Sequence, residues 1–477
     1  MKKAIFGVVL FVVVSVVYLF LSDFSLVKKL IGYNIPQLKE PKTVSENGGE
    51  LSFLDIPEGF EISVVAKDLD NPRVILFDAK GRMLVSETKA GKVSILDPVK
   101  SQGDHGARGG FENKRVLIEG LKSPHGLDFY PSASTSAVSS VPNGSGQVSS
   151  TGIIYLYIAE TQQVVRYRYD VNAGKLVDIA GEQITKLPDG GQPASPAGGH
   201  FTRTIAFGPN FRTSQIIKGL KVVNTQVDTK LYISVGSSCD VCEESTWKRA
   251  AILESDPEGS YTAEFAGGLR NSVFFVFHPV TKEIWATEMG RDNLGDNLPP
   301  DEINIVKVAG PEHKFGARRY GWPFCYGDKV TDKKFNPDKF ERIDIPRNCA
   351  ETEPPVIEIP AHSAPLGLAF IPPGRSWPKE WEGDLLVALH GSWNRSEPAG
   401  YKVVRYDLDK NGKVLSQEPF DFISGWLSTS NQQPVTSNQI YGRPVDLKFN
   451  NDGNLYISDD AAGLIYKVEV SPFSGTI

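Results

Sequence analysis

The chain has 477 residues, of which 40% are hydrophobic and 23% charged, and its formal net charge is −6. These proportions are typical of a soluble globular body, and the length suffices for two domains or for one large all-β architecture. The acidic balance, with a pI near 5.8, argues against a protein that binds nucleic acid through a basic surface, and no run of Lys and Arg forms one. We therefore expect no nucleic-acid partner.

The first 24 residues differ from the rest. Lys2 and Lys3 precede an uncharged stretch from Ala4 to Leu21, which as a helix would span roughly 27 Å, close to the hydrocarbon thickness of a bilayer. Because no small-residue cleavage pattern follows, residues 1–24 are predicted to form an uncleaved membrane anchor; the alternative is a signal peptide whose removal gives a secreted protein. The lysines would stay in the cytoplasm and the body would be exported. Residues 25–50, rich in Pro, Lys, Glu and Gly from Pro36 onward, are interpreted as a linker.

After this linker, one pattern recurs along the chain. Each copy consists of an apolar strand, a turn and a second apolar strand that ends in a polar group. Some copies add a third strand. The copies are PRVILFDAKGRMLVSETKAGKVSIL, then PHGLDFY with IIYLYIAETQQVVRYRY, TRTIAFGPN with KLYISVGSS, RNSVFFVFHPVTKEIWATEMG, APLGLAFIPPG with GDLLVALHGSWN and YKVVRYDL, and finally GRPVDLKFNNDGNLYISDDAAGLIYKV.

Six copies of such a unit predict the blades of a β-propeller, because each small sheet can bury its faces only against its two neighbours. We therefore expect an all-β, six-bladed β-propeller over residues 51–477, with an N-terminal transmembrane anchor helix before it. The early strand GFEISVVAKDL is expected to complete the last blade. The Ser-rich insertion from Ser132 to Thr151 is expected to be a surface loop.

The four cysteines agree with export. Cys239 and Cys242 form a C-x-x-C, and Cys325 and Cys349 flank a polar loop. In an oxidising compartment the simplest interpretation is two disulfides, with Cys239–Cys242 and Cys325–Cys349 as the first choice among three possible pairings. A thioredoxin-like motif, a haem attachment site and a zinc site are less consistent with the surrounding residues.

The propeller interpretation gives the polar residues a common location. In an antiparallel hairpin the start of the first strand and the end of the second lie at the same edge, so every blade would place a basic or imidazole group at one rim. A ring of this kind suits an anionic ligand, although such groups could equally tie the blades together. The groups before the first strands are Arg73, His125, His200 with Arg203, Arg270, His362 and Arg443, and those ending the second strands are Glu87, Glu160, Asp240, Glu288, His390, Asp459 and Asp460.

The stretch from Thr287 to Asn304 suggests a metal. Beyond Glu288, which ends a predicted strand, it combines glycines with four acidic residues, and hard cations such as Ca²⁺ take carboxylate and carbonyl oxygens from irregular loops. A solvated acidic loop is an equally good explanation. The four acids are Asp292, Asp296, Asp301 and Glu302.

Several stretches together resemble the soluble PQQ-dependent sugar dehydrogenases, and the glucose/sorbosone dehydrogenase branch in particular. They are GGHFTRTIAFGPN, KLYISVGSSCDVC, GLRNSVFF, EMGRDNLGDNLPPDEIN, YGWPFCYGD, DLLVALHGSWNR and GRPVDLKFNNDGNLYISDD, in this order between about Gly59 and Val468. The resemblance implies a six-bladed propeller that binds pyrroloquinoline quinone (PQQ) and Ca²⁺ at its mouth and oxidises a sugar or a sugar-derived alcohol or aldehyde.

The resemblance also implies residue roles. His200 matches the family's general base, and Arg270 matches the Arg that stabilises negative charge on the quinone oxygen. Gly290 and Arg291 match the positions whose backbone carbonyls bind calcium, with Asp301 a further candidate metal residue. The candidate cofactor contacts are Asn271, Arg203, Arg443, His390, which stands where the glucose-specific relatives have a Lys, and His125, which takes the place of a glutamine.

Two other functions remain open at this point. A lactonase-like propeller hydrolase would hold a metal on the axis with carboxylates and activate water. An exported scaffold without catalysis would keep the blades but would not need His200 and Arg270 together. The sequence identifies neither the sugar nor the electron acceptor.

Overall fold

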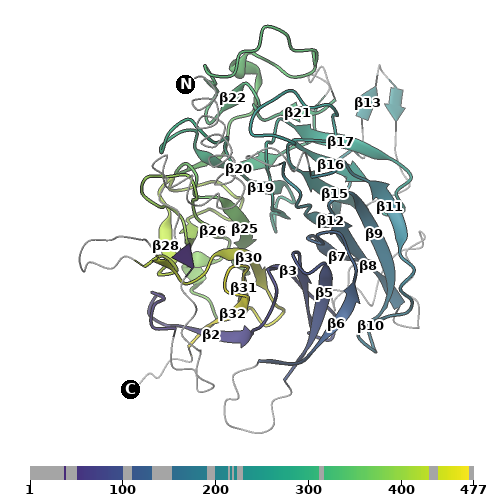
Figure 1. Ribbon diagram of the computed structural model, residues 1–477, viewed down its shortest axis with the longest axis vertical. Helices are drawn as coiled ribbons and strands as arrows, with labels where there is room; N and C mark the ends of the chain where they lie inside the picture. The colour runs from purple at the N-terminus through teal and green to yellow at the C-terminus, as the bar shows by residue number, and fades with distance from the viewer. Residues whose placement is uncertain are drawn as a thin grey trace, which may run out of the picture.

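The structure, a computed structural model, describes residues 37–38, 51–99, 110–131, 153–190, 199–212, 215–217, 220–222, 229–310, 316–428 and 439–471. Six sheets, antiparallel except for one short parallel pair, follow one another around a common centre (Figure 1). The prediction of an all-β, six-bladed propeller is confirmed. The described residues contain no α-helix, and their only helical turns are two 3-10 segments, η1 (Cys349–Glu351) and η2 (Lys379–Trp381).

We number the blades in chain order. Blade 1 contains β3 (Pro72–Phe77), β4 (Met83–Glu87), β5 (Lys92–Pro98) and β6 (Phe111–Glu119). Blade 2 contains β7 (Leu127–Tyr130), β8 (Ile153–Glu160) and β9 (Gln163–Asp170), with β10 (Lys175–Leu176) and β11 (Glu182–Lys186) both paired to β9. Blade 3 contains β12 (Ile205–Pro209), β15 (Thr229–Val235), β16 (Ala251–Ser255), β17 (Thr262–Gly267) and β21 (Arg318–Arg319).

The remaining blades have four strands each. Blade 4 contains β18 (Phe275–Phe277), β19 (Ile284–Glu288), β20 (Asp301–Val306) and β24 (Ile357–Ile359), and blade 5 contains β25 (Pro365–Phe370), β26 (Leu385–Leu389), β27 (Lys402–Tyr406) and β28 (Phe420–Ile423). Blade 6 contains β30 (Pro444–Phe449), β31 (Leu455–Asp459), β32 (Leu464–Val470) and β2 (Phe60–Ala66). Three small pairs lie outside the blades: β1 (Gln37–Leu38) with β29 (Gln439–Ile440), β13 (Gln215–Ile217) with β14 (Leu220–Val222), and β22 (Cys325–Tyr326) with β23 (Val330–Thr331).

The ring closes as the sequence predicts. Strand β2, near the start of the described chain, pairs antiparallel with β32 near its end, from Phe60 opposite Val470 to Ala66 opposite Ile465. Closure in this way joins an early and a late segment of the chain through an antiparallel ladder with one irregularity between Val64 and Ala66, and it gives blade 6 its fourth strand. The cysteine pairing is confirmed as well, because Cys239 is bonded to Cys242 and Cys325 to Cys349.

The hydrophobic core lies between neighbouring blades. Tyr232 and Phe265 of blade 3, for example, form one buried cluster with Phe275 and Ile284 of blade 4. The tyrosine and phenylalanine rings meet edge to face with their centroids 5.2 Å apart, a favoured aromatic arrangement. Each blade therefore buries its two faces against its neighbours, which a four-stranded sheet could not do alone.

Two carboxylates, half-buried Asp128 and buried Asp446, add polar ties between inner strands. Asp128 on β7 accepts a hydrogen bond from the backbone N–H of Phe207 on β12, 2.8 Å away. Asp446 on β30 accepts one from the N–H of Ile75 on β3, also at 2.8 Å. The second tie crosses the point where the ring closes. Burial raises the pKa of both carboxyl groups above the ordinary aspartate value.

The predicted anchor helix of residues 1–24 lies outside the described residues. Within the described part of the chain, no helix has the length and apolar character needed to cross a membrane.

The tie across the ring closure should be measurable. Asp446→Ala would leave the buried N–H of Ile75 without its acceptor, and we expect the free energy of unfolding to fall by about 1–3 kcal/mol in urea titration. Asp446→Asn keeps a side-chain oxygen in place and is the matched control, which should lose less. Equal stability of the Ala and Asn variants would show that the tie contributes nothing.

Candidate active site

The strand register brings the predicted rim residues to one end of the hairpins. Pro72 at the start of β3 pairs with Glu87 at the end of β4, and Pro444 at the start of β30 pairs with Asp459 at the end of β31. The side chains that precede the inner strands therefore share an edge with the acids that end the second strands.

These acids have a common structural task that the sequence did not show. In four blades the carboxylate at the end of the second strand is buried and accepts a hydrogen bond from a backbone N–H in the loop that leads into the first strand. This contact fixes the loop that carries the basic or imidazole rim residue of that blade or, in blade 1, leads directly to it. The pairs are Glu87 with the N–H of Asp70, Glu160 with that of Lys122, Glu288 with that of Asn271, and Asp459 with that of Arg443.

His200 is held by Ser237, which follows the end of β15. The His200 backbone N–H donates to the Ser237 carbonyl at 2.9 Å, and Nδ1 lies 3.1 Å from both that carbonyl and the Ser237 hydroxyl oxygen. The hydroxyl donates its own proton to the carbonyl of Cys239. Since a carbonyl only accepts, the proton of neutral His200 must sit on Nδ1, which leaves the lone pair on Nε2. Nε2 has no hydrogen-bond partner among the described residues.

The surroundings keep this imidazole uncharged. Burial and the nearby Arg270 guanidinium lower the pKa of His200 well below its ordinary value. The imidazole also packs closely on the chain beneath it. A Cβ at Gly236 would lie 2.5 Å from the Cβ of His200 and 2.7 Å from Oδ1 of Asn271, so glycine alone permits both side chains to cover this point.

Arg270 is buried. It contacts Ser237 through its backbone carbonyl, and its side-chain nitrogens all have hydrogen-bond partners. Its carbonyl accepts from the Ser237 N–H at 2.7 Å. Its guanidinium donates from Nη1 to the carbonyl of Gly290 at 2.9 Å and contacts the carboxylates of Asp240 and Asp292 at 3.0 and 3.3 Å. Ser237 thus joins the two residues predicted to be catalytic, and Asn271 lies next to them through its contact with Gly236.

The residues predicted for a metal lie beside Arg270. The Gly290 carbonyl accepts from Arg270, and the Arg291 side chain pairs with Asp332 at 2.8 Å. Asp301 is buried, and its two oxygens accept from the N–H groups of Gly290 and Ala364, each at 2.9 Å. Burial raises the pKa of Asp301 to about 7. These contacts give Asp301 a role in fixing the Gly290 turn, and its direct ligation of a metal stays a prediction.

The described residues offer no preformed acidic cage for calcium. Within the described part of the chain, three potential side-chain ligands come together in one group only, formed by Cys239, Cys242 and Glu244. Its two sulfurs are bonded to each other, so they are not free thiolates. A calcium ion at this mouth would depend on backbone carbonyls and on oxygens of a bound ligand.

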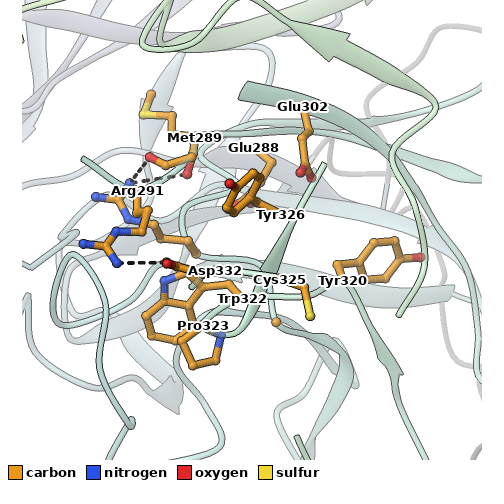
Figure 2. A pocket seen from close by; sticks show the side chains of 13 residues that line it. Glu288, Met289, Arg291, Glu302, Tyr320, Trp322, Pro323, Cys325, Tyr326 and Asp332 are labelled. Atoms are coloured by element: carbon orange, nitrogen blue, oxygen red, sulfur yellow. Dashed lines mark hydrogen bonds and ion pairs between the residues drawn. The ribbon is translucent and has the colours of Figure 1, made fainter. Parts of the chain in front are cut away.

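A small cavity of about 30 Å³ lies behind Arg270 and Gly290, large enough for about one water molecule. Glu288 and Glu302, which are partners in the β19–β20 ladder, line it together with Trp322 and the Arg291–Asp332 pair (Figure 2). Burial raises the pKa of Glu288 to about 8 and that of Glu302 to about 7. This space is too small for a sugar or a cofactor.

The other predicted cofactor residues form a second group at the rim. Asp460 binds His390 Nε2 at 2.8 Å and Arg73 at 2.6 Å, so it bridges blades 5, 6 and 1. Burial and Arg443 lower the pKa of His390 to about 4. Arg443 donates to the carbonyls of His390 and Gly391, and its Nη1 has no partner among the described residues.

Two buried nitrogens in this group lack partners. Nε of Arg73 and Nε2 of His125 are buried, and neither makes a hydrogen bond within the described part of the chain. His125 is fully buried, with Nδ1 3.3 Å from the hydroxyl of Thr204. The pKa of His125 lies well below its usual value. Burial is the main cause, and the charge of Arg73 is the second.

Arg203 differs from the other predicted cofactor residues. It is fully buried, and each of its five N–H donors points to a backbone carbonyl. These contacts are typical of a structural tie between blades 2 and 3, and a bound cofactor would find no free donor on this side chain. Its direct contact with a cofactor therefore lacks support from the geometry. The acceptors are the carbonyls of Thr161, His200, Thr202, Pro188 and Asp189.

The position of the His200 proton gives a prediction that can be tested without measuring enzyme activity. Because its folded pKa is depressed, His200 should stay neutral as the pH falls through 6.5, where an unfolded histidine would gain a proton, and should protonate only far below that value. Nitrogen-15 NMR of the imidazoles, assigned with His200→Gln, should show the Nδ1–H tautomer throughout this range. A titration midpoint near 6.5 would contradict the buried, Arg270-influenced site.

Comparisons with known proteins extend over the whole propeller. A protein of Borreliella burgdorferi with no assigned function is 34% identical over 255 residues, which cover 54% of this chain and 61% of that relative. The pyrroloquinoline quinone-dependent pyranose dehydrogenase of Coprinopsis cinerea is 24% identical over 449 residues, 87% of this chain and 54% of the relative. The chain thus spans between half and two thirds of the length of these two relatives.

Among solved structures, the calcium structure of a Trichoderma reesei protein of carbohydrate-active enzyme family AA12 superposes with a TM-score of 0.63 at 21% identity, covering 89% of this chain and all of that one. At this identity the superposition shows the shared fold. The sequence also matches the family described as TrAA12-like over residues 54–471, which is nearly the entire described propeller. The chain belongs to the TrAA12-like family.

Proposed function

We propose that this protein is a quinoprotein oxidoreductase that oxidises a sugar, or a sugar-derived alcohol or aldehyde, by hydride transfer to PQQ. The observation that carries the proposal is the pair formed by neutral His200, with its free Nε2 lone pair, and buried Arg270, joined through Ser237. Family membership and the named activity of the Coprinopsis relative support it.

The rim residues fit a tricarboxylate such as PQQ. Burying carboxylates requires fixed positive charge and hydrogen-bond donors in reach. Arg443 retains Nη1 as a free donor, and Arg73 Nε and His125 Nε2 are buried without partners. These three groups come from blades 6, 1 and 2, so they can approach an anionic ligand from different directions.

When bound, PQQ would supply the two-electron acceptor for the hydride that leaves the substrate carbon. His200 Nε2 would take the proton of the substrate hydroxyl, so that the C–O single bond becomes a carbonyl while the hydride departs. The Nδ1–H bond to the Ser237 carbonyl would strengthen as the imidazole gains charge, which orients the base and stabilises its protonated form. Arg270, whose side-chain donors are paired within the protein, would act through its positive charge on the negative charge that develops at the mouth, and its fixed position means that little reorganisation is needed.

Ca²⁺ is proposed as an assisting cofactor, held by the carbonyls of Gly290 and Arg291. The Gly290 oxygen already accepts from Arg270, so a divalent cation would sit next to a guanidinium. Such a position is favourable only when anionic oxygens of a ligand lie between the two charges. We therefore expect calcium and PQQ to bind together, each strengthening the affinity for the other.

The rim does not favour the metal-dependent hydrolase. A hydrolase of that kind needs carboxylates that are available to a metal on the axis. Asp240, Asp292 and Asp460 are each bound to arginine side chains.

Export, with the propeller held at the membrane by residues 1–24, is also a proposal. It rests on the uncharged stretch after Lys2 and Lys3 and agrees with the two disulfides. Extraction of the full chain from membranes by alkaline carbonate would contradict the anchor and favour the secreted form.

The base can be tested by substitution. In His200→Ala we expect turnover of aldoses with PQQ and a dye acceptor to fall by roughly 10²–10⁴-fold, while PQQ still binds, because the imidazole is uncharged and contributes little to holding an anion. Saturable PQQ binding followed by its absorbance serves as the control for folding. Full activity of the variant would place the base elsewhere, with His125 and His390 as the next candidates.

The cofactor clamp can be tested without turnover. Arg443→Ala should weaken PQQ binding to the apo protein by about 1.5–3 kcal/mol, the scale of a charge-assisted hydrogen bond, and chelation of Ca²⁺ should weaken it in both proteins. Arg168→Ala, which removes a half-exposed arginine paired only loosely with Asp178 on the outer part of blade 2, is the matched control. If the wild-type protein shows no saturable binding of micromolar PQQ in excess Ca²⁺, the scaffold without catalysis is the better interpretation.

A further inference from the structure

The four-residue loop closed by the Cys239–Cys242 disulfide lies against both halves of the candidate active site. It follows β15 through Gly236 and Ser237, and none of its residues is assigned a role by the resemblance. The disulfide joins residues only three positions apart. Such a short covalent ring fixes the directions of the groups inside it, and Asp240 is one of these groups.

Asp240 contacts Arg270 with both its side chain and its backbone. Its Oδ1 accepts from Arg270 Nη2 at 3.0 Å, and its carbonyl accepts from Arg270 Nε at 2.9 Å. The same Oδ1 accepts from the N–H of Asp292 at 2.7 Å, and Oδ2 lies 3.6 Å from Arg291. Trp322 donates to the Asp240 carbonyl from the other side at 3.1 Å.

The loop reaches His200 as well. The carbonyl of Cys239 accepts the hydroxyl proton of Ser237 at 2.6 Å. This bond turns the lone pairs of the Ser237 hydroxyl toward His200 Nδ1, 3.1 Å away. The tautomer that leaves Nε2 free is therefore supported by the backbone of the disulfide loop.

We propose that the disulfide loop is the device that positions both reacting groups, and that Asp240 is the positioning residue for Arg270. Its bidentate contact fixes the plane of the guanidinium, while the Met289 and Gly290 carbonyls and Asp292 contact the remaining donors. Loss of the Asp240 carboxylate removes one acceptor from Nη2 and frees the Asp292 N–H, so Arg270 can turn away from the mouth. This inference rests on the proposed function only where turnover is measured.

The first test compares Asp240→Ala with Asp240→Asn. A residue that acts by orienting a charge needed in the transition state should affect kcat far more than KM. We expect Asp240→Ala to lower kcat by roughly 10- to 100-fold at nearly unchanged KM. Asp240→Asn keeps the Oδ1 acceptor and should recover most of that loss.

Asp344→Ala is the matched control. Asp344 also pairs with a buried arginine, Arg319, at 2.9 Å, but it has no contact with Arg270, so its removal should leave kcat unchanged. Wild-type kcat in Asp240→Ala, or a rise in KM alone, would overturn the positioning role. Equal losses in the Ala and Asn variants would overturn it too, because the orienting hydrogen bond would then not be the cause.

The second test uses no substrate and no PQQ. In the double variant Cys239→Ser with Cys242→Ser the loop is no longer closed, and the Cys239 carbonyl is free to turn away from Ser237. Nitrogen-15 NMR of His200 at neutral pH should then show a mixture of the two neutral tautomers where the wild-type protein shows Nδ1–H alone. An unchanged tautomer in a folded double variant would overturn the role of the loop. Absence of PQQ-dependent turnover in the wild-type protein would count against the proposed function and leave this second test as the deciding one.

Discussion

The mouth of this propeller depends on a repeated contact between a buried carboxylate and a backbone N–H. In four blades, the acid that ends the second strand accepts a hydrogen bond from the loop that enters the first strand. A buried carboxylate needs hydrogen-bond donors, and the backbone N–H groups of an entry loop need acceptors. The hydrogen bond between them satisfies both groups. The basic residues of the rim are thus carried on loops that are fixed before any ligand arrives, which reduces the cost of binding and orienting a ligand there.

This arrangement separates the acids of the rim into two kinds. Glu288 and Asp459 serve the backbone, and burial raises their pKa values to about 8 and about 6. At neutral pH Glu288 therefore offsets less of the positive charge than an ordinary carboxylate would, while Asp459 stays mostly ionised. Asp460 is different, because His390, Arg73 and Arg443 together outweigh the effect of burial and hold its pKa well below the usual range. Among the described residues, the mouth therefore has several guanidinium groups, while its ionised carboxylates are mostly paired with arginine side chains. This balance favours an anionic ligand over a cationic one.

The sequence was sufficient for the architecture because each blade repeats a local pattern of strand, turn and strand. The closing role of Phe60–Ala66 and the two disulfides also followed from local signals, namely one early apolar strand and the spacing of four cysteines. What could not be predicted depends on atoms that meet only in the folded ring. Ser237 has no motif that reveals its contact with His200, and the short β21, which joins blade 3 from a segment about 50 residues later than β17, has no periodic pattern. Asp240 stood among the predicted rim acids, but the contacts of its carboxylate and its backbone carbonyl with the Arg270 guanidinium depend on the geometry of the loop.

Arg203 and Arg443 show most clearly why residue type at a repeated position does not give function. Both precede an inner strand, and the resemblance assigned both to the cofactor. Around Arg203 the neighbouring loops turn five carbonyls toward the guanidinium, and all its donors are consumed. Around Arg443 two carbonyls are in reach, and Nη1 remains available within the described structure. The difference comes from the carbonyls that the entry loop and the adjacent blade turn toward each guanidinium, and not from the arginine itself. In a propeller, then, a rim cation can donate hydrogen bonds to a ligand only where its surroundings leave some of its donors unpaired, and a fully paired guanidinium such as Arg270 can act only through its charge.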